Sequence, residues 1–188
     1  MNPLLLEIPT KIDTKRLYLR IPMAGEGETV NASIRASINE LKLWLTLYQS
    51  MPEITETEIT VRHAHTQFLN RESLRFLIFS KETDEFIGTC SLHNINWDIP
   101  KFEIGYWIDS RFSGKGFMTE AIQKLTHFAI QELNGRRIEI RCESSNTKSR
   151  MIPEKLGFEL EGILRNEDFS ADGKKLIDTC IYAKIISL

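Results

Sequence analysis

The chain has 188 residues, 41% of them hydrophobic, and a formal net charge of -2. This length and composition suit one globular domain with its own core, so we expect a single domain over residues 1–188. The charge offers no basic surface for nucleic acid, and no apolar stretch is long enough to cross a bilayer. We therefore expect neither nucleic acid nor a membrane as a partner.

The predicted elements mix strands and helices. We expect a strand at 16–21, two short helices within 30–48, a helix at 53–70, and strands at 74–80, 86–95 and 102–108. A long helix at 117–133, a strand at 137–142, a short helix at 148–156 and strands at 158–164 and 175–186 complete the chain. The first four strands form an antiparallel meander, and the long helix is a crossover. The predicted class is therefore α+β.

A turn with two glycines leads from the strand at 102–108 into the long helix. Gly114 and Gly116 let an anion approach the backbone, and the unpaired N–H groups at the helix start attract phosphate. Arg111 and Lys115 add positive charge. The turn is not a Walker A loop, because no Ser or Thr follows the lysine, and it lacks the third glycine of a dinucleotide fingerprint. Simple helix initiation is the alternative role of these glycines.

Two further groups of residues are candidates for chemistry. Asn146 and Ser149 stand just past a predicted strand end, where either one could simply cap a helix. On the strand at 102–108, Glu103, Gly105 and Trp107 share one face. A glycine inside a strand marks a bulge or a close backbone approach, so Glu103 beside it is a candidate site residue.

In their order and spacing, these motifs together resemble the GNAT superfamily of N-acetyltransferases. The strand around Glu103 is similar to that of the RimJ/RimL-type ribosomal-protein acetyltransferases. The matching segments span nearly the whole chain. They are Arg16-Leu17-Tyr18-Leu19-Arg20, Ser91-Leu92-His93-Asn94, residues 103–108, Arg111-x-x-Gly114-x-Gly116, Thr119-Glu120-Ala121, Asn146-x-x-Ser149, Glu154-Lys155-Leu156-Gly157-Phe158 and residues 178–182.

The resemblance implies a mixed, mostly antiparallel, twisted sheet of about seven strands flanked by helices, with the fourth and fifth strands splayed apart. It also implies acetyl-CoA as co-substrate, with its pantetheine arm in the gap and its pyrophosphate on the glycine turn. The implied cofactor-binding residues are Trp107, Ile108, Arg111, Ser113, Gly114, Lys115, Gly116, Phe117, Met118, Thr119, Asn146 and Ser149.

Acetyl transfer to an amine needs a base, a group that polarises the carbonyl, and an acid for the leaving thiolate. The resemblance implies Glu103 as the base, directly or through a water, and Ser149 as the acid. A backbone N–H of Trp107 or Ile108 would polarise the carbonyl. An α-amine with a pKa of about 7.7–8.0 demands less of a carboxylate base than a lysine at about 10.4. We therefore expect a protein N-terminus as the acceptor.

Other readings stay open at this point. The acceptor could be a small amine such as a polyamine or an aminoglycoside, and the chain could be a non-catalytic acyl-CoA-binding module. Trp44 and Trp97 are candidate walls of the substrate groove, with a core position as the alternative for Trp44. A homodimer is left open.

The histidines lack metal-ligand spacing, so we expect no metal site. Cys90, Cys142 and Cys180 are odd in number and lie in apolar stretches, which indicates reduced thiols and a cytoplasmic protein. An acetyl-cysteine route through Cys142 is less favoured than a core thiol, because the sequence shows no Cys–His pair around it.

Overall fold

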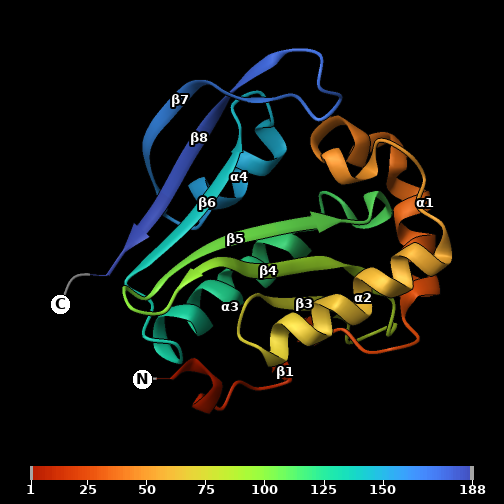
Figure 1. Ribbon diagram of the computed structural model, residues 1–188, viewed down its shortest axis with the longest axis horizontal. Coiled ribbons are helices and arrows are strands. Elements are labelled where there is room, and N and C mark those ends of the chain that lie inside the picture. The colour runs from red at the N-terminus through yellow and green to blue at the C-terminus, as the bar shows by residue number, and fades with distance from the viewer. Residues whose placement is uncertain (1, 187–188) are drawn as a thin grey trace.

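Apolar residues on both faces of its central strands give the chain one sheet with a hydrophobic core on each side (Figure 1). The computed structural model describes residues 2–186. Its eight strands lie in the order β1-β2-β3-β4-β5-β6-β8-β7, and every neighbouring pair is antiparallel except β5 and β6. They are β1 (Lys11–Asp13), β2 (Leu17–Arg20), β3 (Leu74–Ser80), β4 (Phe86–Asn96), β5 (Lys101–Ile108), β6 (Arg137–Glu143), β7 (Glu159–Phe169) and β8 (Leu176–Ile185).

Helices cover the two faces of this sheet. Figure 1 shows α2 in front of β3 and β4, and α3 behind the sheet. The α-helices are α1 (Gly27–Trp44), α2 (Ile54–Leu69), α3 (Phe117–Gln131) and α4 (Thr147–Lys155). Short 3-10 helices are η1 (Pro3–Leu5), η2 (Thr46–Tyr48) and η3 (Ser110–Phe112). The chain is thus the mixed α+β fold that the sequence predicts.

Two hydrophobic cores follow from the alternation of side chains along the strands. Phe102 and Ile104 of β5 pack with Ile122 and Leu125 of α3, and each of the four is at most 2% exposed. On the other face, Trp107 packs against the smaller core beneath α1 and α2. Glu103, Gly105 and Trp107 therefore share the α1–α2 side of the sheet.

The strands β5 and β6 diverge soon after they begin. They pair only from Lys101 to Glu103 on β5 and from Arg137 to Glu139 on β6, although β5 has eight residues and β6 has seven. This confirms the predicted splayed pair of strands. The sequence numbers them four and five, and they are β5 and β6 in the structure because β1 is an additional strand. Past Glu103, one edge of β5 is left without a partner strand.

The predicted elements needed two corrections. The three-residue strand β1 was not predicted, because so short a segment shows no clear alternation. The two short helices expected within 30–48 are one 18-residue helix, α1, followed by η2. No Gly or Pro interrupts residues 30–45, and the helix breaks only where Leu45 turns extended. It begins early because the Glu58 carboxylate accepts hydrogen bonds from the N–H groups of Gly25 and Gly27.

Candidate functional site

The glycine turn presents bare backbone at the start of α3. Gly114 has φ +77° and Gly116 has φ +78°, which are left-handed conformations that favour glycine. Gly116 is the N-cap of α3, and no side chain caps this helix. Its first N–H groups therefore remain available to an outside anion, and the positive end of the helix dipole adds to the attraction. A phosphate fits this arrangement.

A brace from the N-terminal strands holds the turn in place. Arg16 Nη1 donates to the Lys115 carbonyl at 3.0 Å, and its Nε donates to Glu120 at 2.6 Å. Thr14 Oγ1 donates to the same carboxylate at 2.7 Å. Burial raises the pKa of Glu120, but the hydrogen bonds from Thr14 and Arg16 outweigh it and keep that pKa below its ordinary value. Glu120 thus serves to tie α3 to the segment between β1 and β2.

The positive charges beside the turn are not equivalent. Arg111 pairs with Asp109, whose side chain is fully buried, with Nη2 and Oδ2 2.6 Å apart. Ser33 of α1 donates to the same carboxylate oxygen at 2.6 Å. Lys115 stands with Nζ 5.3 Å from the Phe112 ring centroid and has no acidic partner among residues 2–186. Lys115 is therefore the free cation at the turn, whereas Arg111 mainly holds the loop to the buried carboxylate.

Glu103 forms a pair with a histidine that the sequence did not single out as a site residue. His93 Nε2 lies 3.4 Å from Glu103 Oε1, and Asn94 Nδ2 donates to Oε2 at 2.9 Å. Burial raises the pKa of Glu103, but the hydrogen bonds from His93 and Asn94 and the charge of Arg141 bring it below its ordinary value. Glu103 is therefore an ionised carboxylate at neutral pH, placed to orient His93.

Gly105 makes room for that histidine. A Cβ atom at Gly105 would lie 2.8 Å from His93 Cε1, closer than real carbon contacts allow. The imidazole therefore lies over the bare backbone of β5, on the α1–α2 side of the sheet. The only sequence signal for this contact was the glycine itself, because the register that sets His93 opposite Glu103 is a property of the sheet.

The unpaired edge of β5 exposes particular backbone groups. The Asp109 N–H donates to the Ile87 carbonyl on the β4 side, and residues 136 and 137 donate to the Pro100 carbonyl on the β6 side. Because backbone direction alternates along a strand, the N–H and C=O groups of Tyr106 and Ile108 turn toward the gap, and those of Trp107 turn toward β4. The backbone groups available to a partner in the gap are therefore those of Tyr106 and Ile108, whereas the sequence leads us to expect Trp107 and Ile108.

Across the gap, α4 faces Tyr106. Asn146 is the N-cap of α4, and its Oδ1 accepts from the Ser149 N–H at 3.1 Å. The Tyr106 hydroxyl donates to the Ser149 carbonyl at 2.9 Å and lies 3.1 Å from Ser149 Oγ. Nearby on β6, burial raises the pKa of the Cys142 thiol to about 11. Cys142 is thus a protonated thiol at neutral pH.

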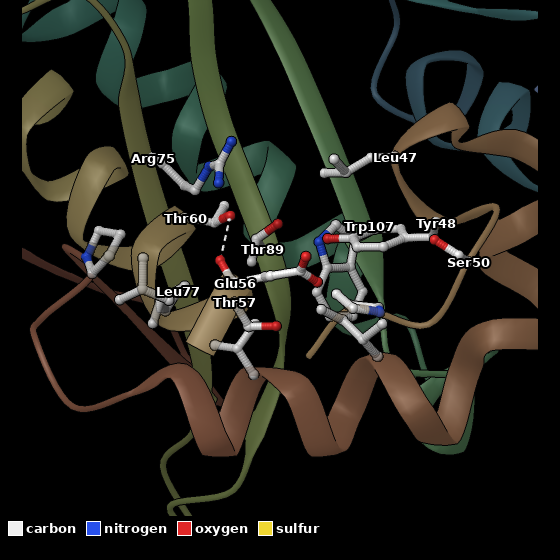
Figure 2. A pocket seen from close by; sticks show the side chains of 15 residues that line it. Leu47, Tyr48, Ser50, Glu56, Thr57, Thr60, Arg75, Leu77, Thr89 and Trp107 are labelled. Carbon is white, nitrogen blue, oxygen red and sulfur yellow. Dashed lines mark hydrogen bonds between the residues drawn. The ribbon is translucent and has the colours of Figure 1, made fainter. Parts of the chain in front are cut away.

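A pocket of about 310 Å³ opens on the α1–α2 side of the sheet (Figure 2). Its aromatic wall is the edge-to-face pair of Tyr48 and Trp107, whose ring centroids are 6.2 Å apart. Its polar lining comes from η2, the loop after it, α2, β3 and β4, and includes Tyr48, Ser50, Glu56, Thr57, Thr60, Arg75 and Thr89.

The two tryptophans expected to wall a groove lie elsewhere. Trp97 follows β4, donates its indole N–H to the Arg71 carbonyl at 3.0 Å and packs edge-on against Phe102. Trp44 ends α1, is 38% exposed and is not part of the pocket lining. The aromatic wall of the pocket is therefore formed by Trp107 and Tyr48.

Among the residues that the structure describes, no cluster of three or more His, Cys, Asp or Glu side chains could hold a metal ion. No helix within residues 2–186 is long and apolar enough to span a membrane. All three cysteines are free thiols.

Comparisons with known proteins give the family of the chain. Residues 16–159 match the model of the acetyltransferase (GNAT) domain. An uncharacterized N-acetyltransferase, p20, of Bacillus licheniformis is 37% identical over 72% of this chain and 82% of its own. The ribosomal-protein-serine acetyltransferase of Escherichia coli is 32% identical over 77% of this chain and 81% of its own.

The solved structure of RimL, a ribosomal alpha-N-protein acetyltransferase in complex with coenzyme A, superposes with a TM-score of 0.84 at 26% identity. The match covers 95% of this chain and 97% of that one. The chain belongs to the GNAT family, and it is an N-acetyltransferase that uses acetyl-CoA.

Proposed function

We propose that this enzyme acetylates the N-terminal α-amine of a protein, by direct attack of the amine on acetyl-CoA in a ternary complex. The observation that carries the proposal is the ionised Glu103 paired with His93, on the pocket side of β5 where β6 departs. Similarity to the Escherichia coli ribosomal-protein-serine acetyltransferase supports an α-amine as the acceptor. The cytoplasmic location expected from the free thiols is part of the same proposal.

The residues of the turn and the gap fit acetyl-CoA. The N–H groups from Gly114 to Met118 would receive the pyrophosphate, with Lys115 adding charge. The unpaired N–H of Tyr106 and the C=O groups of Tyr106 and Ile108 would bind the pantetheine arm as a strand binds its neighbour. This positioning brings the thioester beside the pocket face of β5, and holding two reactants in place can supply about 7–11 kcal/mol of the barrier.

The remaining residues of the site would move the protons that acetyl transfer requires. An α-amine with a pKa of about 8 is neutral about a tenth of the time at neutral pH. As its nitrogen bonds to the acetyl carbon, its proton passes to His93, and the Glu103 carboxylate stabilises the imidazolium that forms. A backbone N–H of β5, that of Ile108, polarises the carbonyl.

The C–S bond then breaks, and the thiolate takes a proton from Ser149, which takes one from water in turn. Burial raises the pKa of Tyr106, although its hydrogen bond to Ser149 opposes the shift. The Tyr106 hydroxyl therefore stays protonated and keeps Ser149 oriented through their contact.

The test measures thiol release and peptide mass with acetyl-CoA and serine- or alanine-initiated peptides. Glu103→Gln should lower kcat about a hundredfold or more and change the pH–rate profile, because the general base His93 then loses the carboxylate that stabilises its imidazolium, and general bases contribute roughly 10²–10⁴-fold. The exposed Glu159, changed to Gln, is the matched control and should leave both unchanged.

A loss of only a few-fold in Glu103→Gln, with the same pH profile, would remove Glu103 and His93 from the proposed step. Preference for spermidine or an aminoglycoside over every peptide would contradict the proposed acceptor. Binding of coenzyme A without turnover on any amine would contradict the proposed reaction.

A further inference from the structure

Arg75 is a charged side chain without a partner in the wall of the pocket. It lies on β3 with its side chain partly buried, and no hydrogen bond or ion pair joins its guanidinium to any residue within 2–186. The other partly buried arginines of this range all have partners: Arg20, Arg71, Arg137, Arg141 and Arg150. A charge that is partly shielded from water in this way gains stability when an opposite charge joins it.

The surroundings of Arg75 favour a single carboxylate as that opposite charge. Thr60, Thr89 and Tyr48 line the pocket with hydroxyl groups (Figure 2). The acidic residue of the lining, Glu56, is already engaged, since its Oε2 accepts from the Glu53 N–H at 2.8 Å in the capping box of α2. A second full negative charge in the pocket would meet repulsion from Glu56, so a monoanion fits better than a phosphate dianion.

We infer that Arg75 recognises an acidic side chain of the acceptor, near the amine that is acetylated. This inference rests on the proposed function and narrows its substrate to N-termini with an Asp or Glu close behind the first residue. The planar guanidinium can grip a carboxylate with two parallel hydrogen bonds, which gives both strength and direction.

The strand register gives the spacing. Arg75, Ser91 and Gly105 lie opposite one another on β3, β4 and β5, and Glu103 stands two residues along from Gly105. With strands about 4.8 Å apart and a rise of about 3.4 Å per residue, the Cα atoms of Arg75 and Glu103 are about 12 Å apart. An extended peptide with its amine near Glu103 would therefore bring a side chain to Arg75 from within about its first four residues.

The experiment compares serine-initiated peptides that carry one glutamate at the second, third or fourth position with matched glutamine peptides. For the wild type, one glutamate position should lower KM about tenfold or more relative to glutamine, with kcat unchanged. Arg75→Gln should abolish this difference by raising the KM for the glutamate peptide to that for the glutamine peptide. Arg75→Lys should keep part of it. Arg136→Gln is the control, because Arg136 is exposed.

Calorimetric binding of the same peptides, with coenzyme A present, separates the two proposals. Acetyl transfer without any preference for glutamate would refute the carboxylate site alone, as would an equal loss for both peptides in Arg75→Gln. Binding that depends on glutamate and on Arg75, but without acetyl transfer, would support the site and refute the proposed function. Stronger binding of phosphoserine than glutamate peptides would refute the assignment to a carboxylate.

Discussion

Alanine at the two glycines of the phosphate turn tests how that turn binds the co-substrate. Gly114, Gly116 and Gly173 share left-handed backbones, with φ of +77°, +78° and +70°. A Cβ atom would meet nothing within 4 Å at Gly114 and Gly173, and would meet only Arg16 Nη2, at 3.5 Å, at Gly116. Gly173 lies in the connection between β7 and β8, away from the turn, and is therefore a matched control for backbone strain.

The cost to stability should be similar at all three positions. An alanine in the left-handed region costs about 1–2 kcal/mol, and no steric clash adds to it here. For a chain of this size, 1 kcal/mol lowers Tm by about 2–4 °C. Each variant should therefore melt about 2–8 °C below the wild type.

Coenzyme A affinity should separate the variants. If the methyl group displaces one charge-assisted hydrogen bond to the pyrophosphate, about 1.5–3 kcal/mol is lost. At about 1.4 kcal/mol per factor of ten, the Kd of Gly114→Ala and of Gly116→Ala should rise about ten- to a hundredfold. Calorimetric titration of coenzyme A, alongside thermal melts, measures both quantities. An unchanged Kd at the turn, or an equal rise in Gly173→Ala, would refute the reasoning.

Three further predictions follow from the site. Gly105→Ala should displace His93 and lower kcat about ten- to a hundredfold, with the calorimetric Kd for coenzyme A unchanged; an unaltered kcat would exclude a role for His93. Cys142→Ser should keep kcat within about twofold at neutral pH, because the thiol pKa is about 11; a much larger loss would favour an acetyl-cysteine route. Burial alone would raise the pKa of Asp109, but the hydrogen bonds from Arg111 and Ser33 outweigh burial and hold the pKa below its ordinary value of about 3.9. The ionised carboxylate therefore stabilises the fold at every pH above that ordinary value. Asp109→Asn should therefore lose about 2 kcal/mol in urea unfolding at neutral pH, and this difference should shrink as pH falls through the lowered pKa; a constant difference would contradict the assignment.

The local features of the site were readable from the sequence. Gly114 and Gly116 indicate the turn because few other residues adopt its left-handed backbone conformation. The apolar alternation from 102 to 108 places Glu103 and Trp107 on one face of the strand. Asn146 and Ser149 mark the start of α4 because their side chains cap helices. Each of these signals depends on residues close together in the chain.

Contacts between distant segments needed the folded chain. The register of β4 on β5 sets His93 beside Glu103, and the departure of β6 frees Tyr106 and Ile108. The packing of α1 and α2 on the sheet leaves Arg75 in a pocket without a counter-charge. The sequence by itself determines which side chains each strand presents on its two faces. Which of those side chains come together is decided by strand pairing and helix packing, because both depend on burial summed over the whole core.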